Sequence, residues 1–184
     1  MVDQEKVTGV QISISPLSPE DIPLLKPILY EHIRNRISSE EREPDVEEIE
    51  AVLGYMQGKP DDLWRVRIYF VAKDDTGQVL GCMAIVDPDP QTVISCGVER
   101  GKTAELVNAF VSSNFYRGKG VGRKLFEEIC AEAVRRGKKY LVLDSGPRYE
   151  DSWGFYDKMM DRRGEPLINR YGENLHSKTW IKEL

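Results

Sequence analysis

The stretch that most constrains this chain runs from residue 104 to residue 125 and reads AELVNAFVSSNFYRGKGVGRKL. An apolar run typical of a strand ends at Val111, a glycine-rich turn begins at Arg117, and a helical apolar pattern starts at Val121. When a strand, a glycine-rich turn and a helix follow one another in this order, unpaired backbone N–H groups point outward at the start of the helix, where the positive end of the helix dipole also lies. Both favour a bound anion there. The stretch therefore predicts a phosphate or pyrophosphate site.

The turn and the first helical residues are the predicted ligands of this anion. Glycine leaves the backbone open to a ligand, and the neighbouring basic side chains add positive charge. The candidates are Arg117, Gly118, Lys119, Gly120, Val121, Gly122 and Arg123. Their spacing matches neither the G-x-G-x-x-G of dinucleotide-binding folds nor a Walker A loop, which needs Ser or Thr after its lysine. A glycine-rich turn with solvated basic residues is the alternative interpretation.

The motif R-G-x-G-x-G at 117–122 resembles the acyl-CoA signature of the GCN5-related N-acetyltransferase (GNAT) superfamily. The segments AELV and FVSS, both within 104–113, resemble the matching strand of the histone acetyltransferase branch. The segment FYDKM at 155–159 resembles the family's F-Y-x-K-x-G-F segment without its final glycine and phenylalanine. The resemblance covers the whole chain in outline, and its specific part is the region that these motifs span.

The resemblance implies an α/β (α+β) fold, in which a mixed, twisted sheet of six or seven strands carries helices on both faces. A chain of 184 residues suits one domain, so we expect a single GNAT domain over residues 1–184. Hydrophobic periodicity and turn signals predict the elements along the chain. Strands are expected at 10–14, 66–72, 79–86, 106–111 and 140–143, and helices at 18–33, 44–56, 121–136 and 151–160.

Three further expectations concern the less regular parts of the sheet. The strands at 106–111 and 140–143 are joined by a helix and should therefore be parallel. In the ambiguous segment 91–102, a strand is expected at Thr92 to Ser95. Two final strands, at 167–171 and 179–184, are expected to form a hairpin.

The resemblance also implies a reaction. Acetyl-CoA is the expected cosubstrate, and its acetyl group passes to a primary amine of a small molecule or a protein by direct attack in a ternary complex. Backbone groups of Ala109, Phe110 and Val111 are expected to align the thioester. Glu105 stands at the position of the base in the histone acetyltransferase branch, and Tyr156 at that of the acid. These residue types suit the chemistry, because an ammonium group must lose a proton before attack and a phenol can protonate a thiolate.

Strand alternation places Glu105 on one face with Val107, Ala109 and Val111, and Asn108 on the other. Apolar neighbours raise the pKa of a carboxyl group, which would improve Glu105 as a base.

Each of these roles has an alternative. Glu105 is otherwise an exposed residue at the start of a strand, and Tyr156 an amphipathic core residue of a helix. The alternative for the whole protein is a CoA-binding sensor or regulatory module without turnover. Within enzymes, transfer from a longer acyl-CoA, or to a protein N-terminus or lysine, stays open.

Charge and composition exclude several classes of partner. A net charge of −5 argues against a nucleic-acid binder, and no apolar run is long enough to span a membrane. Three widely spaced cysteines and two isolated histidines, His32 and His176, predict no metal site. Reduced cysteines and the lack of an apolar signal core predict a cytoplasmic protein. The acidic run at 40–50 is a solvated face or a surface that recruits a cationic amine, and a homodimer stays open.

Overall fold

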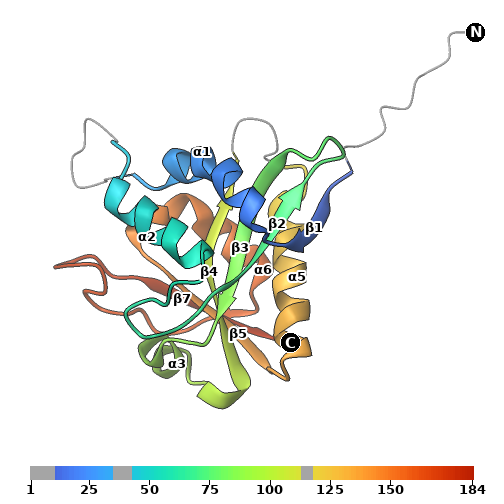
Figure 1. Cartoon of the computed structure of the whole chain (residues 1–184). Coiled ribbons are helices and arrows are strands. Elements are labelled where there is room, and N and C mark those ends of the chain that lie inside the picture. Colours follow the sequence, from blue (N-terminus) through green and yellow to red (C-terminus); the bar gives the residue numbers. More distant parts are fainter. Residues whose placement is uncertain (1–10, 35–42, 113–117) are drawn as a thin grey trace, which may run out of the picture.

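The computed structural model describes residues 11–34, 43–112 and 118–184. Its centre is a seven-stranded mixed sheet with the strand order β1-β2-β3-β4-β5-β7-β6 (Figure 1). Strands β4 and β5 are parallel, and every other neighbouring pair is antiparallel. The strands are β1 Ser13–Pro16, β2 Ile68–Lys73, β3 Val79–Val86, β4 Thr103–Val111, β5 Tyr140–Ser145, β6 Arg162–Arg163 and β7 Lys178–Glu183. The predicted fold class and the parallel pair are confirmed.

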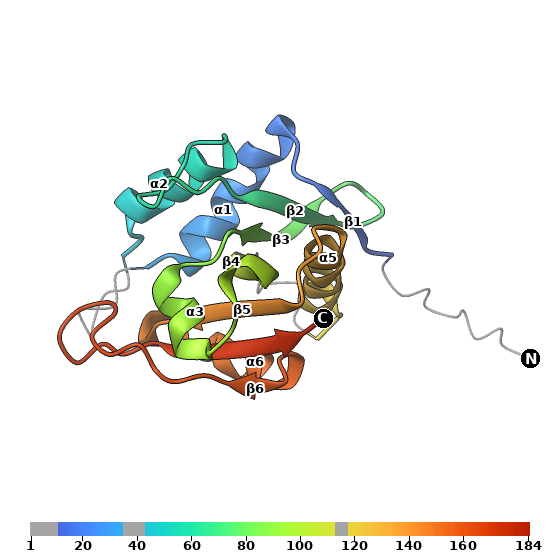
Figure 2. The same cartoon turned by 90° about the horizontal axis from the view of Figure 1, so that it is seen from below.

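Helices cover both faces of the sheet, as the sequence predicts. Helices α1 and α2 bury their apolar sides against β2, β3 and β4 on one face, whereas α5 and α6 form the main core with the other face (Figure 2). Helix α3 packs beside β5 and β7. The helices are α1 Ile22–His32, α2 Val46–Met56, α3 Pro90–Cys96, α5 Val121–Arg135 and α6 Trp153–Met159, with short 3-10 helices η1 Pro19–Asp21, η2 Arg100–Lys102 and η3 Pro147–Ser152.

The first helical segment begins after Ser18, as the sequence predicts, but its first turn is the 3-10 helix η1, and α1 follows from Ile22. The backbone N–H and the hydroxyl of Ser18 both donate to Oδ2 of Asp21 at 3.0 Å, which forms a capping box. The helix ends at His32, because Ile33 leaves the helical region with φ −89° and ψ 94°. His32 is therefore the last residue of α1.

The predicted strand at Thr92 to Ser95 is wrong, because this segment belongs to α3. The carboxylate of Asp89 accepts a hydrogen bond from the N–H of Gln91 at 2.7 Å, and Pro90 follows directly as the first helical residue. An aspartate N-cap followed by proline is a strong helix start, and here it outweighs the strand preference of the β-branched residues.

The predicted strand at 167–171 is also wrong. The outer neighbour of β7 is instead the short strand β6, at Arg162–Arg163, and only an isolated bridge joins Leu167 to Ser177. A two-residue strand carries too little alternation for a sequence pattern to reveal it.

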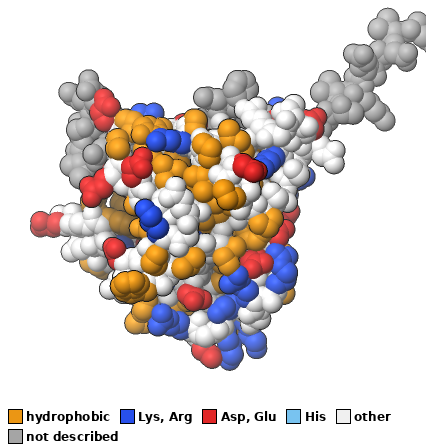
Figure 3. All heavy atoms as spheres, in the orientation of Figure 1, with side chains coloured by type: hydrophobic (Ala, Val, Ile, Leu, Met, Phe, Trp, Pro, Cys, Tyr) orange, Lys and Arg blue, Asp and Glu red, His pale blue; other side chains and the backbone are white. Residues whose placement is uncertain are grey.

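Charged side chains are interspersed over the face shown in Figure 3, with a group of basic ones over the C-terminal end of α5. Arg135 and Arg136 both pair with Glu132 there. Positive charge at the C-terminal end of a helix interacts favourably with the helix dipole. In the part of the chain that the structure describes, no helix is both long enough and apolar enough to cross a membrane.

Candidate active site

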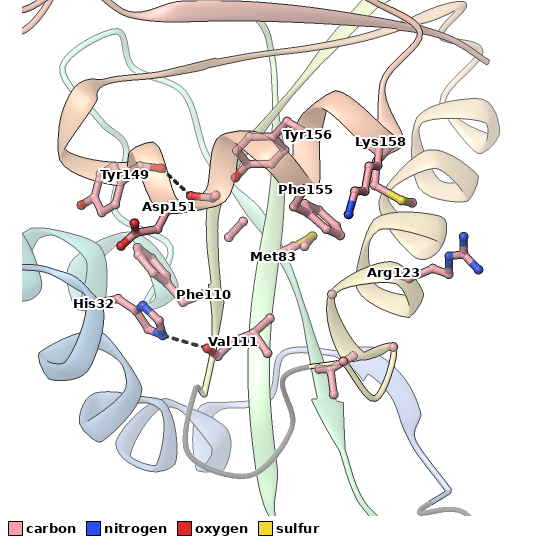
Figure 4. A pocket seen from close by; sticks show the side chains of 17 residues that line it. His32, Met83, Phe110, Val111, Arg123, Tyr149, Asp151, Phe155, Tyr156 and Lys158 are labelled. Atoms are coloured by element: carbon pink, nitrogen blue, oxygen red, sulfur yellow. Dashed lines mark hydrogen bonds between the residues drawn. The ribbon is translucent and has the colours of Figure 1, made fainter.

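The candidate site lies where two parallel strands stop pairing. Strand β4 pairs with β5 only over Thr103–Glu105 and Tyr140–Val142, although β4 continues to Val111. Beyond that pairing, β4 borders a pocket of about 580 Å³ (Figure 4). The pocket is lined by His32, Met83, Ala109, Phe110, Val111, Gly118, Gly120, Val121, Gly122, Arg123, Tyr149, Asp151, Ser152, Phe155, Tyr156, Lys158 and Met159.

The glycine-rich turn forms one end of the pocket. Gly118 and Gly120 have φ of 82° and 83°, which is the left-handed region that favours glycine, and Gly120 is the N-cap of α5. A Cβ at either position would meet no other atom within 4 Å, so the backbone is open to a ligand. Five of the seven predicted anion ligands line the pocket: Gly118, Gly120, Val121, Gly122 and Arg123. Lys119 is not among the lining residues, and Arg117 lies outside the described residues.

Strand β4 contains a bulge just before the residues that line the pocket. Ala84 of β3 lies opposite Val107, and Cys82 lies opposite Phe110, so β4 advances three residues where β3 advances two. Asn108, with φ of 51°, lies at this irregularity.

The bulge breaks the alternation of side chains that the sequence predicts. Val107 packs against the cluster formed by α1 and α2, and Glu105, two residues before it, lies on the same face of β4, where it contacts Thr92 of α3. Ala109 and Val111 instead pack against the α5 face. The prediction that Glu105 shares a face with Ala109 and Val111 is therefore wrong. Asn108 is not on the opposite face from Glu105 either, because it bonds to Tyr69, which packs against α1 and α2. The extra residue of the bulge is the physical reason for both corrections.

Tyr156 lies on α6 and lines the pocket. Its ring packs against Phe155 and Trp180, with centroid distances of 5.6 and 5.4 Å. Burial raises the pKa of its phenol to about 12, although a hydrogen bond with Ser152 opposes the shift. The side chain is therefore a neutral O–H donor at neutral pH, which is the form that an acid catalyst needs.

Glu105 lies apart from the residues that line the pocket, and it is only 2% exposed. Its Oε2 accepts hydrogen bonds from Nη1 of Arg65 and from the N–H of Asp89, both at 2.8 Å. Its Oε1 accepts one from the hydroxyl of Thr92 at 3.2 Å. Burial raises the pKa of Glu105 to about 7, against the opposing effects of Asp89 and Arg65. Its role as the base stays a prediction.

A family model confirms the likeness that these motifs indicate. The model described as the Acetyltransferase (GNAT) family matches residues 29–161, which is well over half of the chain. The chain belongs to the GNAT family. The match includes α2, β4, the glycine turn and α6, so it covers every element of the pocket except most of α1. No curated protein matches the chain significantly.

Solved structures show the same GNAT fold. A GNAT-family acetyltransferase from Desulfovibrio desulfuricans has a TM-score of 0.70 at 15% identity, covering 94% of this chain and 99% of that chain. An N-acetyltransferase from Staphylococcus aureus has a TM-score of 0.65 at 20% identity, covering 94% and 98%. The acetyltransferase yncA of Salmonella typhimurium, solved with its cofactor acetyl-CoA, has a TM-score of 0.64 at 18% identity, covering 95% and 94%. At these identities the likeness establishes the fold.

The end of the GNAT pocket away from the glycine turn contains residues that the sequence did not reveal. His32, Tyr149 and Asp151 line it from α1 and η3 (Figure 4). Nε2 of His32 lies 2.7 Å from the carbonyl oxygen of Val111, although 79 residues separate the two in the chain. In the sequence, His32 is an isolated histidine at the end of a helix, and nothing local indicates that it faces β4.

An ion-pair cluster joins this end of the pocket to α2. Arg148 of η3 contacts the carboxylates of Asp45, at 2.7 Å, and of Glu48. The hydroxyl of Tyr149 donates to Glu48 as well, at 2.8 Å. Asp45 and Glu48 of the acidic run therefore form ion pairs within the protein, in addition to their partial exposure to solvent.

Proposed function

We propose that this GNAT protein transfers the acetyl group of acetyl-CoA to a primary amine of a small molecule or a protein, by direct attack in a ternary complex. The observation that carries the proposal is the shared pocket of three features: the open glycine turn, the part of β4 beyond its pairing with β5, and Tyr156. Each feature performs a different part of the reaction.

The glycine turn holds the diphosphate of the cosubstrate. Backbone N–H groups at 118–122 and the positive end of the α5 dipole favour a bound anion. Arg123 and Lys158 line the same pocket and add two positive charges. Arg117 is proposed as a further ligand from the sequence motif alone. Acetyl-CoA, when bound, supplies an activated acetyl thioester.

The free part of β4 aligns the thioester. The N–H of Ser112 donates to the carbonyl oxygen of Leu80 on β3. Because backbone groups of successive residues in a strand point to alternate edges, the N–H and C=O of Val111 point away from β3. Ala109 and Phe110 line the pocket beside it. Fixed backbone donors in such a position stabilise the negative charge that develops on a carbonyl oxygen.

Tyr156 is the proposed acid, because it is a buried neutral phenol in the wall of the pocket. It donates its proton to the sulfur as the C–S bond breaks. Glu105 stays the base that the family resemblance suggests, and its pKa of about 7 suits that role. Its position outside the residues that line the pocket does not suit this role.

The names of the structural neighbours do not choose an acceptor. One is a spermidine N-acetyltransferase from Vibrio cholerae, at 14% identity, and another is described as a phosphinothricin N-acetyltransferase, at 20% identity. The first substrate is a polycation and the second an amino acid. A panel of amines of different charge is therefore needed.

The test is an assay of free CoA thiol with acetyl-CoA and this amine panel, run on the wild type and on Tyr156→Phe. We expect turnover with at least one amine and a fall in kcat of about 100-fold in the variant, with the Kd for acetyl-CoA nearly unchanged. Equal rates would remove Tyr156 from the mechanism. Binding of acetyl-CoA without CoA release over the whole panel would favour the sensor alternative, and absence of binding would overturn the proposal.

A further inference from the structure

His32 presents a ring nitrogen to the pocket in a defined state. Its Nε2 lies 2.7 Å from the carbonyl oxygen of Val111, and a carbonyl oxygen can only accept a hydrogen bond. In the neutral ring the hydrogen therefore sits on Nε2, and Nδ1 keeps its lone pair. The two ring nitrogens point in different directions, so Nδ1 is turned away from β4 (Figure 4).

The imidazole is held in place and is still accessible. Its ring packs against Phe110 with a centroid distance of 6.3 Å and an interplanar angle of 33°. The side chain of His32 is 28% exposed, and the residue lines the same pocket as Ala109 and Tyr156. An acceptor amine that enters this end of the pocket therefore meets Nδ1 on the way to β4.

Negative charge lies around this end of the pocket. His32 is the last residue of α1, where the negative end of the helix dipole lies. Oε1 of Glu31, on the same helix, lies 3.8 Å from Nε2. From η3, Asp151 lines the same end of the pocket, and Tyr149 adds a hydroxyl group that bonds to Glu48 of α2. The carboxylates of Glu31 and Asp151 attract an ammonium group to this end of the pocket.

Glu105 lacks these advantages. Each of its oxygens already accepts a hydrogen bond within the protein, and the residue is nearly sealed from solvent. A base must come within hydrogen-bond reach of the proton that it takes. His32 meets this requirement from the wall of the pocket, whereas Glu105 would have to exchange a protein partner for the amine.

We infer that His32 is the general base, with Nδ1 as the atom that takes the proton from the acceptor ammonium. The inference rests on the proposed acetyl transfer. The freed amine nitrogen forms a bond to the acetyl carbon, and the C–S bond breaks. The sulfur takes the proton of Tyr156, and the second proton lost by the nitrogen restores Tyr156. The proton on His32 passes to solvent, so the products are the amide, CoA thiol and one proton.

The test compares two acceptors that differ in the basicity of the amine. One is the best alkylamine of the panel, and the other is its β-trifluorinated counterpart, which is already neutral at the assay pH because three fluorine atoms strongly lower the pKa of its ammonium form. For His32→Gln, which keeps a donor for Val111, we expect kcat/KM to fall about 100-fold with the alkylamine and less than about threefold with the fluorinated amine. The Kd for acetyl-CoA should stay unchanged. Imidazole added to His32→Ala should restore part of the lost rate.

The matched control is Glu105→Gln with the same two amines. Equal losses with both amines in His32→Gln would show a structural role and overturn the inference, while the proposed function would stand. A loss confined to the alkylamine in Glu105→Gln, and absent in His32→Gln, would also overturn it and assign the base to Glu105. A wild type that releases no CoA with any amine would overturn the proposed function itself, and this inference with it.

Discussion

The hydroxyl of Tyr69 donates a 2.8 Å hydrogen bond to Oδ1 of Asn108, and it thereby ties β2 to the bulge of β4. Tyr69 is buried, and Asn108 has a φ of 51°, which few residues other than glycine adopt at low cost. Because Ala109 follows directly, this bond helps to hold the backbone where β4 enters the pocket.

Substitutions at Asn108 separate the backbone strain from the hydrogen bond. Asn108→Gly loses the bond but also relieves the backbone strain, so it should lower the free energy of unfolding by at most about 1 kcal/mol. Asn108→Ala loses the bond and retains a strained backbone, and it should lower it by about 2 kcal/mol. Tyr69→Phe loses only the bond and should lower it by about 1 kcal/mol. Urea unfolding measures all three, and an alanine variant as stable as the glycine variant would contradict the strain.

The glycine turn is tested by a pair of matched glycines. Gly120 and Gly137 both have positive φ, of 83° and 72°, and both have open space where a Cβ would go. Each alanine substitution should therefore cost about 1 kcal/mol of stability. Only Gly120 lines the pocket, so Gly120→Ala should also weaken acetyl-CoA binding, by about tenfold. Calorimetric titration showing equal Kd values for the two variants would contradict the placement of the diphosphate.

The raised pKa of Glu105 predicts a pH dependence of stability. Its folded-state pKa of about 7 exceeds the ordinary value of 4.5, so the folded protein holds this proton more tightly than the unfolded chain does. The resulting stabilisation is complete below pH 4.5 and is lost as the pH rises towards 7. The difference in unfolding free energy between the wild type and Glu105→Gln should therefore fall with rising pH over this window. A constant or rising difference would contradict the burial of the carboxyl group.

The raised pKa of Tyr156 predicts that the acid stays protonated in alkaline solution. Burial raises this pKa to about 12, above the ordinary value of 10.0. With an acceptor that is neutral throughout, kcat should not decline between pH 8 and about pH 10.5. Stopped assays of CoA release over this range check the expectation. A decline in kcat centred near pH 10 that disappears in Tyr156→Phe would instead show that the phenol of Tyr156 has its ordinary pKa.

Local sequence signals were enough to predict the elements that form the proposed cosubstrate site. Ser18 and Asp21 cap η1, which leads into α1, by contacts three residues apart, and the glycine turn needs only the strand before it and the helix after it. The parallel pairing of β4 and β5 also follows from their connection through a helix. These features depend on residues that are close in the sequence, so their patterns are readable there.

Features that depend on contacts between residues far apart in the sequence could not be predicted from it. The bulge at Asn108 exists only in the register of β4 against β3, and it reversed the expected facing of Ala109 and Val111 relative to Glu105. His32 reaches Val111 across 79 residues, through the packing of α1 on the sheet. No pattern within one segment encodes such a contact, and the proposed base is therefore the least predictable part of the candidate site.

The central claim is that acyl-CoA binds at the glycine turn beside β4. The most direct measurement is hydrogen exchange of the backbone amides with and without CoA, read from peptides that cover 109–112 and 118–125. The account predicts slower exchange in both segments on binding, and no change at residues 137–140, at the far end of α5. Saturating CoA that leaves both segments unprotected, or that protects another surface instead, would contradict it.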